Sequence, residues 1–221
     1  MMHAWRGRTL AQCIAYPLLA LCIGCAGIGT KMDVKVLVPP DPVSQKAVVI
    51  AKVEDVRSFE QGSRQAATPS LKSGKITDTN ITSRAIARTR SGFGGATDNI
   101  VLPEGRTVQL VAREAVISAF REKGNSVIDR DAPGNERAIP IEITIEKFWA
   151  WVTPGIGIRP AAVEFEAELV LSGDITPLRG GKRFRGSALL NSIGSGNPRT
   201  FRATIDKGLQ DLVQTLKESL D

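Results

Sequence analysis

The chain has 221 residues, of which 42% are hydrophobic, and 29 basic against 23 acidic side chains give it a net charge of +6. This length is sufficient for one domain with its own hydrophobic core. The single histidine and all three cysteines lie within the first 25 residues. Beyond residue 25 the sequence therefore excludes disulfides, zinc sites of cysteine and histidine ligands, and nucleophile–histidine catalysis.

Residues 1–24 have the layout of a secretory signal peptide. Arg6 and Arg8 form a basic start, residues 10–21 are mostly apolar, and small or apolar residues precede Cys25. The apolar stretch is shorter than the roughly 20 residues that a transmembrane helix needs. The pattern predicts export from the cytoplasm.

Ile23-Gly24-Cys25 resembles a bacterial lipobox, whose cysteine is lipidated and becomes the first residue of the mature protein. Cys22 stands where such boxes generally carry leucine, and the alternative is an ordinary secretory signal with a chance cysteine. In enterobacterial lipoproteins an aspartate after the cysteine signals inner-membrane retention, so Ala26 implies sorting to the outer membrane. Several acyl chains on Cys25 would make membrane attachment permanent.

The predicted mature part carries 27 basic and 23 acidic residues, because Arg6 and Arg8 leave with the signal. A net charge of +4 is ordinary for a soluble surface, although it also suits anionic lipid or cell-wall polymer. The envelope compartment argues against nucleic acid as a partner, and no residue pattern calls for a cofactor or a metal. We expect a membrane-anchored protein that faces the periplasm.

The first residues after Cys25 predict a tether. Residues 27–44 are rich in glycine and proline, which disfavour packed structure. The alternative is a short strand formed by the apolar residues Val34, Val36, Leu37 and Val38. The β-branched run at 47–53 predicts a buried strand that opens the folded domain. The expected organisation is a signal at 1–24, a lipidated tether at 25–45 and a single α+β domain at 46–221.

Two further stretches precede the first long helix. The polar residues 61–80 predict a long surface loop. Residues 83–89 alternate and predict a short edge strand. Thr107 is a suitable N-cap, and apolar residues at helical spacing follow it as far as Gly124. A helix is therefore predicted over 108–123, with a short strand at 126–128 after it.

The last third of the chain predicts three strands and a second helix. Residues 139–152, 162–171 and 182–191 alternate between apolar and polar side chains. Asn197-Pro198 opens a helix with an apolar stripe, in which Gly208 costs about 1 kcal/mol relative to alanine. We expect an α+β fold in which two main helices pack on one face of an antiparallel or mixed sheet.

The strands also carry the candidate site residues. Trp149 and Trp151 precede an apolar loop and are candidates for partner binding together with Ile156 and Ile158. The alternative is that both tryptophans end a core strand under a helix. On the next strand, Glu164, Glu166 and Glu168 share one face, where period two points them at solvent. The third strand has Arg183 and Arg185 on one face, opposite these glutamates if the strands are antiparallel neighbours.

The order of these parts resembles the YajG-type bacterial lipoproteins. The resemblance covers nearly the whole mature chain: a lipobox, a strand at 47–55, the stretch 86–94, a helix ending at Gly124, the strands of 139–191 and a final helix. Its motifs have low specificity, and the segment 61–80 is atypical. The resemblance implies an outer-membrane location and this fold, and it supplies no catalytic residues.

Three functional hypotheses follow. The first is a non-enzymatic lipoprotein whose periplasmic domain binds a protein partner or scaffolds an envelope complex. The alternative is an auxiliary lipoprotein of a transport system that binds a lipid or a small apolar ligand between helices and sheet. The third, a hydrolase that uses carboxylates alone, requires two of Glu164, Glu166, Glu168 and Asp174 to converge in a cleft.

Overall fold

The computed structural model describes residues 29–44, 46–72, 75–91, 95–133, 135–155, 160–192 and 196–220. The predicted signal peptide and Cys25 lie outside these residues. The strands are β1 (Thr30–Lys31), β2 (Ala47–Asp55), β3 (Glu60–Gln61), β4 (Ser70–Leu71), β5 (Ala85–Arg90), β6 (Ala96–Val101), β7 (Ser126–Ile128), β8 (Ile139–Thr153), β9 (Ala161–Gly173) and β10 (Lys182–Ser192). The helices are α1 (Thr79–Thr82), α2 (Val108–Glu122) and α3 (Pro198–Ser219), with the 3₁₀ turns η1 (Asn135–Arg137) and η2 (Thr176–Leu178).

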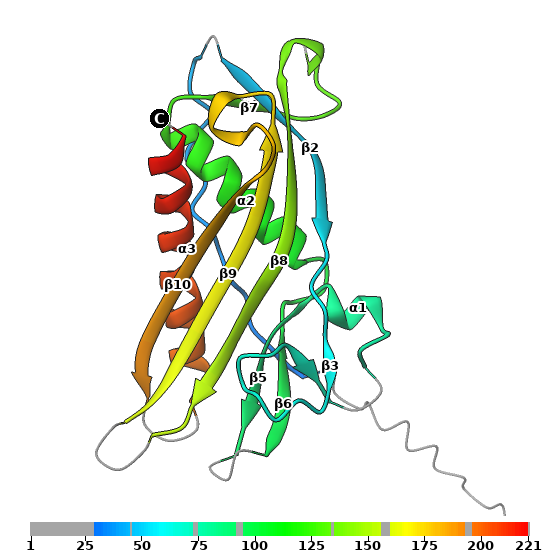
Figure 1. Ribbon diagram of the computed structural model, residues 1–221, viewed down its shortest axis with the longest axis vertical. Helices are drawn as coiled ribbons and strands as arrows, with labels where there is room; N and C mark the ends of the chain where they lie inside the picture. Colours follow the sequence, from blue (N-terminus) through cyan, green and yellow to red (C-terminus); the bar gives the residue numbers. More distant parts are fainter. Residues whose placement is uncertain are drawn as a thin grey trace, which may run out of the picture.

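The long strand β8 organises an eight-stranded mixed sheet (Figure 1). On one side it pairs with β9, which pairs with β10, and both contacts are antiparallel. On its other side β8 pairs in parallel with β2 along its first half and with β5 at Ala150. Strand β7 extends the sheet beyond β2, and β6 and β1 extend it beyond β5. The predicted α+β class is confirmed.

Helices α2 and α3 cover one face of this sheet, the inner face, as predicted. Their apolar stripes and the inner residues of β2, β8, β9 and β10 form one continuous core. The predicted Thr107 cap is confirmed, because its side chain accepts a hydrogen bond from the Leu110 amide. Asn197, predicted to open the last helix, is also an N-cap and accepts a hydrogen bond from the Thr200 amide. Gly124 follows the last turn of α2 with a φ of 77°, a left-handed conformation that favours glycine. None of the helices in the described ranges is both long and apolar enough to cross a membrane.

A β-bulge in β8 changes which residues face the helices. The register with β9 shifts between Ile145 and Lys147. Before the bulge the odd-numbered residues face the core, whereas after it Phe148 and other even-numbered residues do so. Continuous alternation would have kept Trp149 and Trp151 on the inner face. The bulge instead turns both tryptophans to the outer face, the side of the sheet away from the helices.

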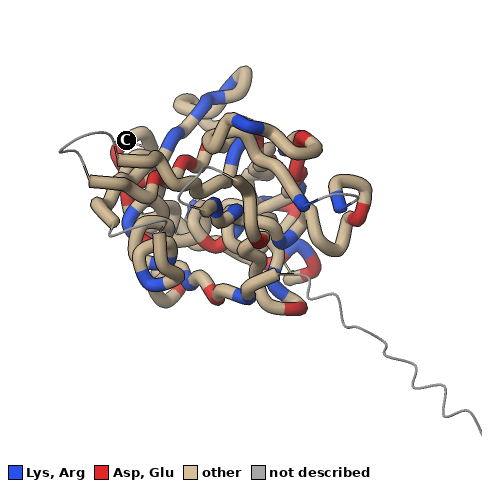
Figure 2. The backbone as a smooth tube through the Cα atoms, turned by 90° about the horizontal axis from the view of Figure 1, so that it is seen from below, with Lys and Arg blue, Asp and Glu red and all other residues tan. Residues whose placement is uncertain are grey.

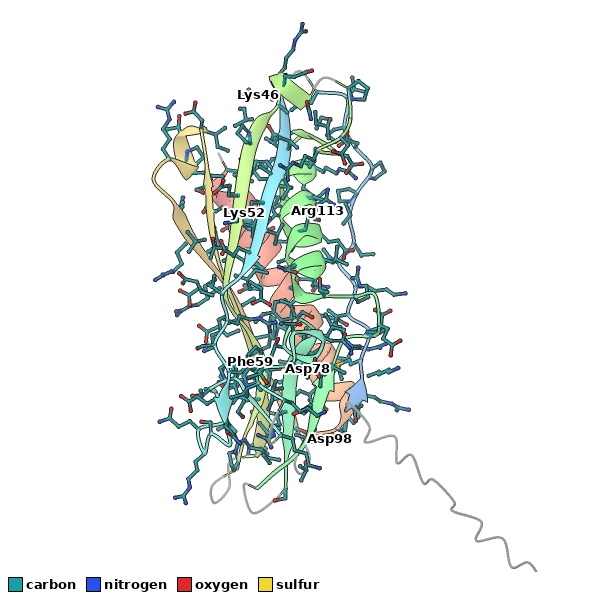
Figure 3. The ribbon with its side chains drawn as sticks, turned by 90° about the vertical axis from the view of Figure 1, so that its right-hand side faces the viewer. Lys46, Lys52, Phe59, Asp78, Asp98 and Arg113 are labelled. Atoms are coloured by element: carbon teal, nitrogen blue, oxygen red, sulfur yellow. The ribbon has the colours of Figure 1, made fainter. Side chains whose placement is uncertain are left out.

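The outer face beside β5 and β8 is covered by a segment that we call the cap, residues 56–72 and 75–84. It contains β3, β4 and α1, and it packs along the lower half of the molecule, where Figure 3 labels Phe59 and Asp78. Together with the sheet it encloses a second hydrophobic cluster, formed by Leu71, Ile81, Ala85, Val101 and Trp149 with Phe59, Ile76 and Trp151 at its margin. The predicted loop at 61–80 is therefore a packed layer.

Arg57 joins the cap to the sheet. Its fully buried guanidinium forms an ion pair with Asp55 at 2.8 Å and donates hydrogen bonds to the carbonyl oxygens of Thr82, Ala85 and Phe148. These bonds tie the end of β2 to the cap, β5 and β8. Pairing and hydrogen bonds of this kind offset the cost of removing a charge from water.

Two predictions about element position are wrong. Strand β5 was expected at an edge of the sheet, but it lies between β6 and β8 and its first four residues are buried. Residues 29–44 were expected to form a tether. They begin with β1 and then run along α2, where Met32 and Val34 are 3% and 0% exposed. The apolar residues of this segment complete the core, and burying them offsets the entropy of ordering the chain.

Candidate binding groove between the two long helices

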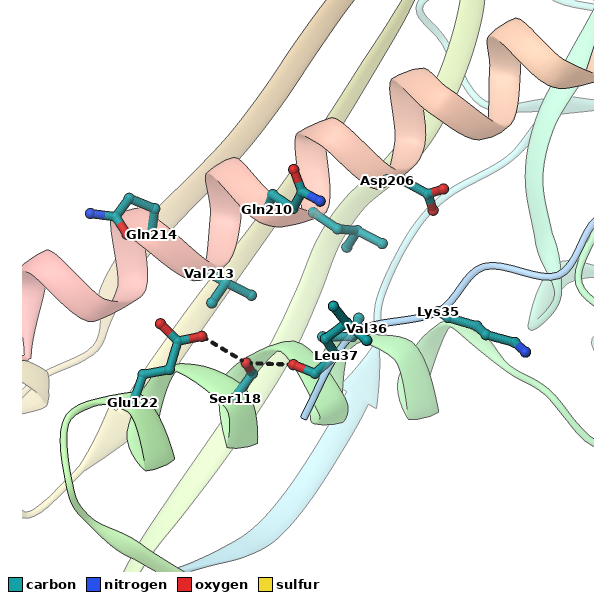
Figure 4. Close-up of a pocket in the computed structure, with 10 residues that line it drawn as sticks. Lys35, Val36, Leu37, Ser118, Glu122, Asp206, Gln210, Val213 and Gln214 are labelled. Atoms are coloured by element: carbon teal, nitrogen blue, oxygen red, sulfur yellow. Dashed lines mark hydrogen bonds between the residues drawn. The ribbon is translucent and has the colours of Figure 1, made fainter. Parts of the chain in front are cut away.

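An open groove of about 430 Å³ runs between α2 and α3 (Figure 4). Leu209 and Val213 of α3 and Val36 and Leu37 of the N-terminal segment supply its apolar surface. Leu37 is 88% exposed, although its neighbours in the segment are partly buried. The polar rim consists of Lys35, Ser118, Glu122, Asp206, Gln210 and Gln214.

Hydrogen bonds fix one wall of the groove. The Ser118 hydroxyl oxygen lies 2.9 Å from the Leu37 carbonyl oxygen and 3.2 Å from a Glu122 carboxylate oxygen. The other Glu122 oxygen accepts a bond from Lys217 of α3 at 3.1 Å. One turn along α2, Arg121 donates to the Pro39 carbonyl oxygen at 3.0 Å. The N-terminal segment is thus held against α2 by its own backbone, which leaves the Leu37 side chain free to project.

Asp206 gives the rim an unusual carboxylate. It is half-buried on α3, and burial raises its pKa because the charged form loses hydration. Arg202 opposes this effect, whereas the negative charge of Asp33 adds to it. Figure 4 shows Asp206 at one end of the groove, beyond Gln210. A half-buried carboxylate of this kind favours a hydrogen-bond donor or a cation as a neighbour.

A second cleft adjoins the groove and shares residues 35–37 with it. Arg106 forms a two-point ion pair with Glu114 of α2, at 2.5 and 2.9 Å, and donates to the Val34 carbonyl oxygen at 3.1 Å. The hydrogen bond from Arg106 to Glu114 raises the pKa of the arginine and outweighs its partial burial. Residues 35–37 therefore form a ridge between two clefts.

Trp149 does not provide the predicted docking surface. It is 1% exposed, packs edge-on against Phe59 at 6.0 Å between ring centroids, and donates its indole N–H to the Ala66 carbonyl oxygen at 3.2 Å. Trp149 is instead a buried core residue, as in the alternative given above. The segment that buries it is the cap, whereas the alternative expected a helix. The chain itself occupies the surface that a partner would need.

Trp151 lies at the margin of the same cluster and is half-buried. The Lys147 ammonium lies 5.1 Å from the centre of its ring and 2.5 Å from Glu166. Trp151 is thus the one predicted docking residue in the described ranges that keeps an accessible ring. Ile156 and Ile158 lie outside the described residues.

The outer-face glutamates form an ion-pair ladder with the next strand, as the alternation predicts. Glu168 pairs with Arg183 at 2.8 Å and Arg185 at 3.4 Å, and Glu166 pairs with Arg185 at 2.9 Å. Glu164 accepts a hydrogen bond from Thr153. The Glu166 and Glu168 carboxylates are therefore engaged in ion pairs with arginines. Asp174 is exposed and pairs with Arg179, away from this face.

In the described part of the chain, no three His, Cys, Asp or Glu side chains are grouped so as to hold a metal ion. Lysines and arginines alternate with acidic residues over the surface (Figure 2), so the described chain presents a mixed field. The sequence does not reveal the groove, because Leu37 in its wall lies in the segment predicted to be a tether. The one available signal was an apolar run, 34–38, within a segment otherwise rich in glycine and proline.

No family model matches the sequence, and no curated protein is significantly similar to it. Two solved structures show low similarity to this one. An uncharacterized protein is 8% identical, with a TM-score of 0.39, covering 80% of this chain and 100% of that chain. A protein named as a neuraminyllactose-binding hemagglutinin homolog from Helicobacter pylori is 9% identical, with a TM-score of 0.38, covering 87% and 92%. At this level of similarity neither structure bears on the function of this chain.

Proposed function

We propose that the protein is a non-enzymatic, lipid-anchored lipoprotein of the bacterial outer membrane, of the YajG type, that binds an envelope protein through the α2–α3 groove. The observation that carries the binding role is Leu37, which is 88% exposed at the edge of a groove whose other apolar residues are partly or fully buried. An exposed leucine between two helices is an anchor for a partner's apolar side chains.

The composition of the groove favours a protein segment as the occupant. Its rim combines acidic, basic and amide side chains, and the groove is partly open to solvent. Sites that enclose a lipid chain are predominantly apolar and bury most of the ligand. A peptide, by contrast, matches apolar contacts at the centre with hydrogen bonds at the rim. The transport alternative, a bound lipid or small apolar ligand, fits this lining less well.

The groove is tested by site-specific photo-crosslinking in cells from Gln210, which lies on its exposed rim. We expect one dominant adduct with an envelope protein, lost in the Leu37→Asp variant because a charge replaces the apolar anchor. Val43→Asp is the matched control, since Val43 is fully exposed outside the groove. An adduct that survives Leu37→Asp, or equal loss in both variants, would reject the groove as the interface.

The anchor is tested separately by labelling with a radioactive fatty acid, followed by membrane fractionation. We expect label and outer-membrane recovery for the natural chain and neither for Cys25→Ala. Equal labelling of both chains would remove the lipoprotein assignment while leaving the groove experiment intact. Lipid retained by the full chain in a native mass spectrum, and lost in Leu37→Asp, would support the transport alternative over protein binding.

A further inference from the structure

Arg88 is a buried cation without a counter-charge. It lies on β5 beneath the cap and is 7% exposed. Within the described residues, its Nη1 donates a hydrogen bond to the hydroxyl of Ser70 on β4 at 3.5 Å, which is the outer limit for such a bond. Its Nε has no partner at all. The structure thus buries the Arg88 side chain and leaves its Nε–H donor without an acceptor.

The other buried or half-buried arginines show how different this is. Arg57 is paired with Asp55, Arg106 with Glu114 and Arg121 with Asp41. Arg84 also has an unpartnered nitrogen, but its Nε and Nη1 donate to the carbonyl oxygens of residues 80 and 102. No carboxylate of the described chain lies within ion-pair distance of Arg88.

The surroundings of Arg88 add positive charge. Arg90 follows two residues later, on the same face of the strand, and donates to the carbonyl oxygens of Ser63 and Gln65 in the cap. Burial lowers the pKa of Arg88, and the charge of Arg90 lowers it further. An arginine nevertheless remains protonated at neutral pH, so the cost of the unpaired charge stays in the folded state.

We propose that Arg88, with the Ser70 hydroxyl and the charge of Arg90, forms a binding site for a small oxyanion group, either a free phosphate or the phosphate of a lipid headgroup. A planar guanidinium with unused donors binds an oxyanion by parallel charge-assisted hydrogen bonds. The hydroxyl supplies one more donor. The bound anion would neutralise the buried charge and hold the cap on β5.

The alternative is that Arg88 serves packing alone and supports β4 through Ser70. The anion-site hypothesis and the packing hypothesis predict different effects of removing the Arg88 charge on the stability of the fold. If an anion normally compensates the guanidinium, Arg88→Met should fold at least as well as the natural chain in the absence of anions, because an unpaired buried charge disappears. If the guanidinium is structural, the same variant should be destabilised in every buffer.

The test is thermal unfolding of the full chain in an uncharged detergent and a zwitterionic buffer, with and without inorganic phosphate. We expect phosphate to raise the midpoint of the natural chain in a saturable way, corresponding to about a 100-fold gain in the folding equilibrium constant at 100 times Kd. Arg88→Met should lose this gain. Arg137→Met is the control, because Arg137 is exposed on η1, remote in sequence, and should respond like the natural chain.

Equal phosphate responses of the natural chain and Arg88→Met would overturn the proposal, as would a midpoint lowered equally by the substitution in both buffers. If Arg88→Met does not fold, Arg88→Lys decides, because lysine keeps the charge and loses the planar fork. We then expect a phosphate response at least tenfold weaker in apparent affinity. An unchanged response in the lysine variant would reject the site.

The source of the anion is resolved with vesicles and the full chain carrying Cys25→Ala, so that no lipid anchor contributes. A headgroup site predicts co-sedimentation with phosphatidylglycerol vesicles, but not with phosphatidylcholine vesicles, and loss of binding in Arg88→Met. A phosphate-dependent midpoint without vesicle binding assigns a free phosphate. Absence of both effects would reject the site altogether.

Discussion

The buried charged residues of this protein differ in how many partners compensate their charge. Arg57 has a carboxylate and three carbonyl oxygens, whereas Arg88 has one distant hydroxyl. Asp41 shows the acidic counterpart: burial alone would raise its pKa, but hydrogen bonds from Ser126, the Val127 amide and Arg121 produce a net lowering. Asp206 has no such donors among the causes of its shift, and its pKa is raised.

The raised pKa of Asp206 predicts a specific pH dependence of stability. Between the ordinary value of 3.8 and the raised value, the folded state binds more protons than the unfolded state, so stability falls as pH rises through this window. Asp206→Asn removes that cost. We expect the variant to unfold in more urea than the natural chain at pH 7 and the two midpoints to converge below pH 3.8. An advantage that persists at low pH would contradict the charge argument.

At the scale of elements, close packing outweighs intrinsic propensity. Gly208 lies inside α3, where glycine is unfavourable, yet a Cβ there would lie 2.3 Å from the Phe165 ring on β9. Gly186 on β10 is restricted in the same way, since its Cβ would lie 2.6 Å from the Gly208 carbonyl oxygen. The two glycines let the helix approach the sheet closely. The sequence shows the cost of Gly208 to the helix but not this contact.

Gly208→Ala should therefore destabilise the protein although alanine is the better helix former. The clash with Phe165 costs about 1–3 kcal/mol and exceeds the propensity gain of about 1 kcal/mol. Urea unfolding measures the net change in free energy. Ala203→Gly is the control: this residue is exposed on α3, and the substitution reports propensity alone. A stabilised Gly208→Ala variant would show that helix and sheet can separate without loss.

At the scale of the whole molecule, segments distant in sequence complete one another. The N-terminal residues 29–44 lie against α2, on the side of the helix that the sheet leaves open, and the cap lies on the opposite, outer face (Figure 3). The sheet therefore has cover on both sides near β5 and β8. Both covering segments contribute buried side chains, and both had been predicted to lie outside the core.

Val34→Ala distinguishes a packed segment from a tether. Val34 is fully buried in the main core, so truncation should cost about 2 kcal/mol in the free energy of unfolding. Val43→Ala, at an exposed position of the same segment, should change stability by less than about 0.5 kcal/mol. Urea unfolding of the full chain measures both. An unchanged free energy of unfolding in Val34→Ala would contradict this packing and support a tether at residues 29–44.

The sequence by itself determined the types of the long elements β2, α2, β8, β9, β10 and α3, because caps and periodicity act over a few residues. Thr107, Asn197 and Gly124 mark helix ends through local hydrogen bonds and backbone geometry. Alternation predicts that Glu166 and Glu168 share one strand face and that Arg183 and Arg185 share one face of the next strand. In the structure Arg185 lies opposite Glu168 in the register and forms ion pairs with both glutamates. The α+β class followed from these local signals, since each leaves an apolar face that another element must cover.

Only the tertiary structure decided the register within β8, the interior place of β5 and the cover supplied by residues 29–44 and the cap. One extra residue at the bulge reverses the faces of Trp149 and Trp151, and period-two patterns cannot show it. The groove at Leu37 and the unpaired charge of Arg88 depend on neighbours many residues away. Such contacts are selected by the free energy of the whole packed chain, which no local pattern contains.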